Sequence, residues 1–150
     1  GSKMNLIKSI VLACAPKRAF TLFTEHASEW WPPSRRHTND PTSTILLTSS
    51  GRFYERAADG REVDLGKIRQ WEPGRRVLLN FYPGTDAEHP TEVEISFTAE
   101  GAGTRVTIDH RPTVSSEALW EGRVSRYDAS WTSCLAGLEK AAREGVANCN

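Results

Sequence analysis

Apolar and polar residues alternate along much of this chain, first from Leu6 to Ala13 and then repeatedly between Thr44 and Arg111. A period of two is typical of strands that bury one face of a sheet. Short turn sequences such as Ser50-Gly51 and Pro73-Gly74 separate the runs. After a first strand at Leu6–Ala13, the pattern therefore predicts six more strands: Thr44–Ser49, Arg52–Arg56, Glu62–Trp71, Arg76–Tyr82, Thr91–Ala99 and Thr104–Arg111.

The last two predicted strands determine which face of the sheet is buried. Strict alternation means that one face packs on the core and the other meets water. The residues expected to face the core are Val93, Ile95, Phe97, Ala99, Val106, Ile108 and His110. The residues expected to meet water include Glu92, Glu94, Thr107 and Asp109, and opposed Glu and Arg or Thr side chains could pair there across the strands.

Helical spacing replaces the alternation after the first strand. Pro16 suits the first turn of a helix, where its missing N–H costs little, and Phe20 and Phe23 give this helix an apolar stripe. A second short helix is expected at His26–Trp31, because Pro32-Pro33 stops it. The polar stretch Ser34–Thr42 is predicted to be a loop.

A long helix is predicted near the C-terminus. Ser115-Ser116 could cap its start, Gly122 could kink or interrupt its first part, and it should end before Gly145. Its apolar residues recur at helical spacing: Trp120, Val124, Tyr127, Trp131, Cys134, Leu135 and Leu138.

The order of the predicted elements indicates an α+β fold. Hairpin-linked strands followed by a helix are typical of an antiparallel sheet, not of a doubly wound parallel one. We expect a curved antiparallel sheet of six to seven strands around the long C-terminal helix, with two short helices after the first strand. Residues 1–150 are expected to form a single domain, in which Gly1-Ser2-Lys3 is an expression scar before Met4.

The composition narrows the possible functions. The chain is 38% hydrophobic and 25% charged, which is typical of a globular domain and not of a disordered one. Its 19 basic and 19 acidic residues cancel, so charge gives no reason to expect nucleic-acid binding. There is no apolar run of the roughly 18 residues that insertion into a membrane needs. Cys14, Cys134 and Cys149 are far apart, as expected for reduced thiols in a cytoplasmic protein.

A series of short landmarks resembles a known family. They begin with Pro16, Ala19-Phe20 and Trp30-Trp31, and end with Tyr127 and Trp131. Between these lie Gly51-Arg52-Phe53-Tyr54-Glu55-Arg56, Asp59-Gly60-Arg61-Glu62, Gly66, Trp71-Glu72-Pro73, Thr91-Glu92-Val93, Gly103-Thr104-Arg105-Val106 and His110. In their order and spacing they resemble bacterial homologues of the activator of the ninety-kilodalton heat-shock protein's ATPase, within the START-like (SRPBCC) superfamily.

The resemblance covers about Leu6 to Ala142 and implies the helix-grip fold, in which the sheet wraps the C-terminal helix. Two departures are mild: Pro73-Gly74 stands where the family often has two prolines, and Ser130-Trp131 stands where it often has Gly-Trp. The eukaryotic activator that gave the family its name has a separate domain that binds the chaperone, and this chain has no room for it. The resemblance therefore implies a fold and not a co-chaperone activity.

An aromatic set is expected to converge between the sheet and the long helix. These side chains could be ordinary core, or they could form the wall of a ligand cavity, since binding sites for small molecules are mostly apolar. The candidates are Trp30, Trp31, Phe53, Trp71, Phe81, Phe97, Trp120, Tyr127 and Trp131.

Glu55 and His110 are the polar candidates for such a cavity. Glu55 shares strand parity with Phe53, and His110 continues the inward set of its strand. They could orient a ligand or act as an acid–base pair. Alternatively, both lie at strand ends and reach water, or Tyr54 faces inward in place of Glu55. The basic segment Ser34-Arg35-Arg36-His37 could bind an anion at the cavity mouth or could be a solvated loop.

Other chemistry has little support in the sequence. There is no nucleophile elbow, and the spacing of the four His and three Cys residues indicates neither a metal site nor a cofactor. The first hypothesis is a non-catalytic module that binds a small hydrophobic molecule between the sheet and the C-terminal helix. The alternatives are an enzyme of the polyketide cyclase or dehydratase kind, and a chaperone regulator or other protein-interaction module, although no protein partner is indicated.

Overall fold

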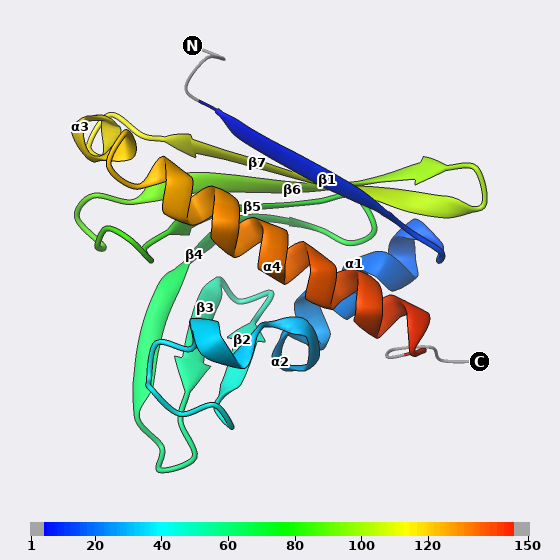
Figure 1. The fold of residues 1–150 in the computed structure, drawn as a ribbon, viewed down its shortest axis with the longest axis horizontal. Coiled ribbons are helices and arrows are strands. Elements are labelled where there is room, and N and C mark those ends of the chain that lie inside the picture. The colour runs from blue at the N-terminus through cyan, green and yellow to red at the C-terminus, as the bar shows by residue number, and fades with distance from the viewer. Residues whose placement is uncertain (1–4, 146–150) are drawn as a thin grey trace.

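The computed structural model describes residues 5–145, so Met4, the three residues before it and Cys149 lie outside the described part of the chain. Within it, the strands and helices follow the predicted order (Figure 1). The strands are β1 (Leu6–Leu12), β2 (Thr44–Leu47), β3 (Arg52–Arg56), β4 (Glu62–Glu72), β5 (Arg76–Phe81), β6 (Thr91–Glu100) and β7 (Gly103–Pro112). The helices are α1 (Pro16–Glu25), α2 (Ala27–Trp30), the 3₁₀ turn η2 (Pro33–Arg35), α3 (Glu117–Trp120) and α4 (Val124–Arg143).

The seven strands form one antiparallel sheet in the order β1-β7-β6-β5-β4-β3-β2. Successive strands from β2 to β7 are neighbours, and β1 is added beside β7. The sheet curls, and α4 crosses its concave face diagonally (Figure 1). This arrangement confirms the helix-grip fold, with seven strands around the long C-terminal helix.

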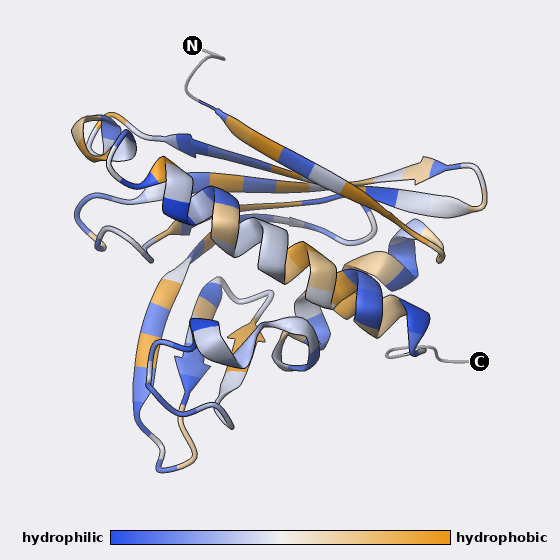
Figure 2. Cartoon of the chain, viewed as in Figure 1, coloured by the Kyte–Doolittle hydropathy of each residue, from blue (hydrophilic) through white to orange (hydrophobic). Residues whose placement is uncertain are grey.

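The core-facing residues predicted for β6 and β7 are confirmed, with one exception described below. Val93, Ile95 and Phe97 on β6 and Val106 and Ile108 on β7 are buried. Figure 2 shows the alternation as contrasting bands along β4 and β6.

The water-facing side is less exposed than expected. Glu92, Glu94 and Asp109 are half-buried because all three pair with Arg111, at 2.6, 3.2 and 3.2 Å. Ion pairs between these carboxylates and Arg111 therefore cover part of this face of the sheet. The inward position predicted for Ala99 is wrong: this residue is exposed, near the tip of the β6–β7 hairpin.

The segment after β1 packs on the end of the sheet away from α3. Pro16 is the first residue of α1, and Phe20 and Phe23 place their rings 5.2 and 5.9 Å from that of Phe97. α2 is shorter than predicted, and the predicted loop begins with the single turn of η2. The loop is therefore more ordered at its start than its polar composition indicated.

The predicted long helix is two helices. α3 ends at Trp120 and α4 begins at Val124, so Trp120 is not on the long helix. Gly122 lies between them, where glycine's low helix propensity favours a break. Ser116 occupies the N-cap position of α3 without a side-chain cap hydrogen bond; its hydroxyl instead accepts from the backbone N–H of Thr113. Within residues 5–145, no helix combines the length and apolar character needed to cross a membrane.

Helix α4 lies against backbone as well as side chains. Its core face carries Tyr127, Trp131, Leu135 and Leu138, all buried. Gly137 is positioned where an added Cβ would lie 2.3 Å from the carbonyl oxygen of Trp30. Only glycine therefore allows α4 to lie this close to the end of α2.

We predict that Gly137→Ala lowers the free energy of unfolding. In an exposed helix this change would stabilise by about 1 kcal/mol, but here the methyl group would overlap backbone that cannot move aside as a flexible side chain does. Urea unfolding of the variant and the wild type measures the difference. A variant as stable as the wild type, or more so, would contradict the close approach of α4 and α2.

Candidate functional site

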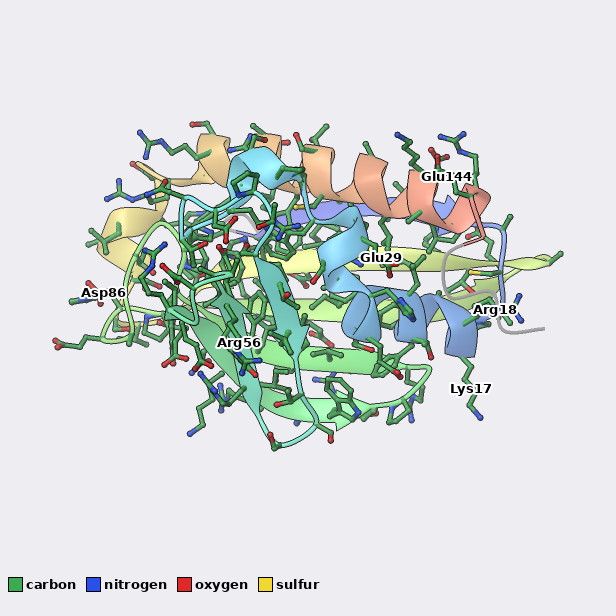
Figure 3. All side chains as sticks on the ribbon, turned by 90° about the horizontal axis from the view of Figure 1, so that it is seen from below. Lys17, Arg18, Glu29, Arg56, Asp86 and Glu144 are labelled. Carbon is green, nitrogen blue, oxygen red and sulfur yellow. The ribbon has the colours of Figure 1, made fainter. Side chains whose placement is uncertain are left out.

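A cavity of about 260 Å³ opens between the end of β5, the η2 turn and the first half of α4. The loop after β5 borders it through Pro83 and Gly84. Asp86, two residues further along this loop, lies at the α3 end of the molecule, whereas Lys17 and Glu144 lie at the other (Figure 3). Thirteen residues line the cavity: Trp31, Ser34, Arg35, Arg36, His37, Phe81, Pro83, Gly84, Arg126, Tyr127, Ser130, Trp131 and Cys134.

Four aromatic rings make up much of the cavity wall. The ring of Trp131 lies 5.7 Å from that of Phe81 and 6.5 Å from that of Trp31, and the rings of Phe81 and Tyr127 are 6.1 Å apart. These separations are typical of packed aromatic pairs. The rings leave an apolar wall because their polar tips are already bonded to the protein.

Each polar tip has a partner within the protein. The indole N–H of Trp31 donates to the carbonyl of Arg35 (3.3 Å), and the hydroxyl of Tyr127 donates to the carbonyl of Pro83 (2.8 Å). Gly84, which adopts a positive φ of 83°, lies directly beside Tyr127: an added Cβ would be 2.6 Å from the phenolic oxygen. The loop after β5 is therefore closely fitted to α4.

His110 lies behind the wall and supports it. The indole N–H of Trp131 can only donate, so it donates to Nδ1 of His110 (3.0 Å). The proton of the ring is then on Nε2, which donates to the hydroxyl of Thr91 (2.8 Å). That hydroxyl donates to the carbonyl of Phe81 (3.2 Å). Burial lowers the pKa of His110 to about 3, so the ring is neutral at pH 7 and both of its nitrogens are used.

Glu55 is fully buried beneath the loop that follows η2. Its carboxylate accepts four hydrogen bonds: from the backbone N–H groups of His37 (2.7 Å) and Thr38 (2.9 Å), and from the hydroxyls of Thr38 (2.5 Å) and Ser43 (2.9 Å). Burial by itself would raise the pKa of this carboxyl, but the four donors outweigh it and lower the pKa. Glu55 therefore stays charged and holds the loop against β3.

The structure contradicts two of the alternatives for Glu55 and His110: that they act as an acid–base pair, and that both reach water. The two residues lie on β3 and β7, and β4, β5 and β6 separate these strands in the sheet. Each side chain is also fully buried and bonded to other groups. The alternative that Tyr54 faces inward is wrong as well: its ring is not part of the core cluster and lies 3.7 Å from the guanidinium of Arg52 and 5.4 Å from that of Arg56. Figure 3 shows Arg56 on the outside of the sheet.

The structure divides the predicted aromatic set. Trp31, Phe81, Tyr127 and Trp131 line the cavity, whereas Trp30, Phe53, Trp71, Phe97 and Trp120 do not, nor do Glu55 and His110. Phe53 stacks on Phe81 at 6.2 Å, and Trp120 packs on His110 at 5.1 Å, so both support the wall from behind. Trp71 instead contacts Phe20 of α1, at 5.3 Å.

The basic segment Ser34-Arg35-Arg36-His37 lies at the cavity, but its members differ in role. The guanidinium of Arg36 donates to the carbonyls of Ser28 (3.0 Å), Trp31 (3.2 Å) and Ser43. All three basic residues line the cavity, and Arg36 also fixes the loop.

Several lining residues were not among those predicted. Arg126 and Ser130 lie beside the predicted core face of α4, and Cys134 belongs to that face, so the helix period alone could have located them. Pro83 and Gly84 lie in a loop that carries no such signal. Burial raises the pKa of Cys134 to about 12, so its thiol is protonated and unsuited to nucleophilic attack. Among residues 5–145, no three His, Cys, Asp or Glu side chains are grouped so that they could hold a metal ion.

Comparison with known proteins agrees with this fold. Residues 13–143 match the model of a family described as Activator of Hsp90 ATPase homolog 1-like protein. The chain belongs to this family. Among curated protein sequences, none matches it.

Solved structures resemble this member of the Hsp90 ATPase activator homologue family over nearly its whole length. The self-sacrificing resistance protein CalC from Micromonospora echinospora has a TM-score of 0.74 at 24% identity, covering 96% of this chain and 97% of its own. A protein from Nitrosomonas europaea has a TM-score of 0.69 at 15% identity, with the same coverage. A protein from Arthrobacter aurescens has a TM-score of 0.65 at 14% identity, covering 97% of this chain and 90% of its own. At these identities the likeness shows the fold alone.

We predict that Glu55→Gln destabilises the protein by about 2 kcal/mol or more, since hydrogen bonds to a buried charge contribute about 1.5–3 kcal/mol. The amide would present an N–H group to donors that need an acceptor. The loss should appear in urea unfolding and as faster proteolysis within residues 37–43. As a control, Glu62→Gln removes a surface partner of Arg52 and Arg56 and should change stability little. Equal effects of the two variants would contradict the role of Glu55.

We also predict a pH-dependent stability that originates in His110. Its folded pKa is lowered from 6.5 to about 3, so only the unfolded chain binds this proton between these values. The free energy of unfolding should be flat above pH 6.5 and should fall by up to about 1.4 kcal/mol per unit as the pH drops below it. The lowered pKa of Glu55 adds its own loss only below about its ordinary value of 4.5.

Urea unfolding between pH 7.5 and about 5 measures this slope, because carboxyl groups add little in that range. Burial also lowers the pKa of His37, so this ring adds its own part to the slope, and the part due to His110 is the difference between the wild type and His110→Gln. His110→Gln should flatten the slope, although it lowers stability at neutral pH. His89→Gln, which removes a half-exposed ring paired with Asp86, is the control and should keep it. A slope unchanged in His110→Gln would show that His110 is not the group that titrates.

Proposed function

We propose that this protein binds a small hydrophobic molecule in the cavity between β5, η2 and α4, without transforming it. The observation that carries the proposal is the aromatic wall, in which the polar tips of Trp31, Tyr127 and Trp131 are already bonded within the protein. Such a wall offers apolar contact without unmet donors of its own. The volume of about 260 Å³ is just under the roughly 300–1,000 Å³ of typical ligand sites, which suits a small ligand.

The state of the nearby reactive groups supports binding over catalysis. The thiol of Cys134 is protonated, the ring of His110 is neutral with both nitrogens bonded, and the carboxylate of Glu55 accepts four hydrogen bonds. A general acid or base must be free to exchange a proton with the substrate. The enzyme hypothesis depended on Glu55 and His110, so it loses its support.

A protein-interaction role would need an exposed apolar patch. Among residues 5–145, the exposed large apolar side chains are Ile7 and Val11 on the edge strand β1, and Val114 before α3. We therefore rank this alternative below ligand binding.

The test is a neutral fluorescent probe, N-phenyl-1-naphthylamine, titrated into the wild type and two variants. Ser130→Phe places a ring at the cavity, whereas Ala136→Phe places the same ring on the exposed side of α4. We expect the first to weaken probe binding by about tenfold or more and the second to leave it unchanged. Thermal unfolding checks that both variants are folded. No binding to the wild type, or equal binding to both variants, would contradict the proposal.

A further inference from the structure

The charged residues that line the cavity are all basic. They are Arg35, Arg36 and Arg126, joined by His37, and no Asp or Glu lies among the lining residues. The chain as a whole has no net charge, so this local excess of positive charge is a property of the site and not of the composition.

Arginines elsewhere in the described residues are mostly neutralised. Those in ion pairs with Asp or Glu are Arg52, Arg56, Arg61, Arg69, Arg75, Arg76, Arg105, Arg111 and Arg143. Arg35 and Arg126, by contrast, make no ion pair with any residue between 5 and 145. Arg36 and Arg123 have no carboxylate partner either, but their guanidinium groups donate to backbone carbonyls. Arg35 and Arg126, whose guanidinium groups have neither kind of partner among these residues, line the same cavity.

The two arginines line the cavity from different elements. Arg35 belongs to η2, where its carbonyl accepts the indole N–H of Trp31, and the loop that follows is fixed by Glu55. Arg126 precedes Tyr127 on α4, next to the aromatic wall. A ligand that packs on the wall would thus have cationic groups beside it from two different elements of the fold.

Arg36 adds a buried hydrogen-bond donor without a partner to the lining of this cavity. Its terminal nitrogens are committed to backbone carbonyls, but its Nε is buried and, among residues 5–145, is the one buried side-chain polar atom with no hydrogen-bond partner. An unsatisfied buried donor costs free energy unless an acceptor arrives. An acceptor group on a ligand would meet this requirement as well.

We propose that the ligand is a small aromatic carboxylic acid, whose ring packs on Trp31, Phe81, Tyr127 and Trp131 and whose carboxylate binds Arg35 and Arg126. This inference rests on the proposed function and adds the charge of the ligand to it. Guanidinium groups bind carboxylates with paired, charge-assisted hydrogen bonds. A carboxylate at the mouth also supplies the counter-charge that the two arginines lack within the protein.

The experiment compares 2-naphthoate with 2-naphthamide, which has the same shape and no charge, by isothermal titration calorimetry. The wild type should bind the naphthoate about tenfold more tightly than the amide, as expected for a charge-assisted hydrogen bond. Arg35→Gln and Arg126→Gln should each remove most of that preference and leave amide binding unchanged. Arg126→Lys keeps the positive charge but loses the paired N–H donors of the guanidinium, so it should retain part of the preference for the naphthoate.

Arg143→Gln is the control, because it removes an exposed arginine at the other end of the same helix. It should keep the full preference for the naphthoate. Equal binding of the two compounds, or a preference that survives in both Arg35→Gln and Arg126→Gln, would overturn the inference and leave the proposed function standing. If the wild type binds neither these compounds nor N-phenyl-1-naphthylamine, both proposals fail.

Discussion

Four elements of the fold are joined by one chain of buried hydrogen bonds, which runs from Trp131 on α4 through His110 on β7 and Thr91 on β6 to the carbonyl of Phe81 on β5. The chain has one direction only, because an indole can donate but not accept. That constraint keeps the imidazole neutral and fixes which nitrogen carries its proton. Since Trp131 and Phe81 both line the cavity, the position of the aromatic wall depends on a residue that does not touch the cavity itself.

A second buried group, the carboxylate of Glu55, fixes the loop after η2, which lines another part of the cavity. Glu55 carries a full charge in the interior, which is costly unless donors surround it. The donors come from His37, Thr38 and Ser43, so a single carboxylate organises a loop with little regular structure after η2. Charge in this protein is therefore used in two ways. It orders the chain at Glu55, and it is left uncompensated at Arg35 and Arg126.

Much of the fold could be predicted from the sequence, since period-two alternation in β6 and β7 and helical spacing in α4 both follow from burying one face. The break between α3 and α4 could only be suspected at Gly122, because a flexible residue permits a break without requiring one. The site was harder to predict. Strand parity correctly placed Glu55 and His110 in the interior, but parity says nothing of which strands are neighbours in space, and three strands separate these two. The positions of Pro83 and Gly84 in the site depend on how a loop meets a helix, which no local pattern encodes.

Two glycines, Gly84 and Gly137, limit how α4 can be repositioned on the rest of the fold. Gly137 lets the helix rest on the backbone of Trp30, and Gly84 lets a loop rest on the ring of Tyr127. An added Cβ would overlap the backbone of Trp30 at the first point and the ring of Tyr127 at the second, so both glycines are needed for α4 to lie where it does. The capacity of the cavity is therefore a quantity that evolution or an engineer would adjust by changing wall side chains such as Trp31, and not by shifting the helix. Relatives with the same backbone could in this way accommodate molecules of different size.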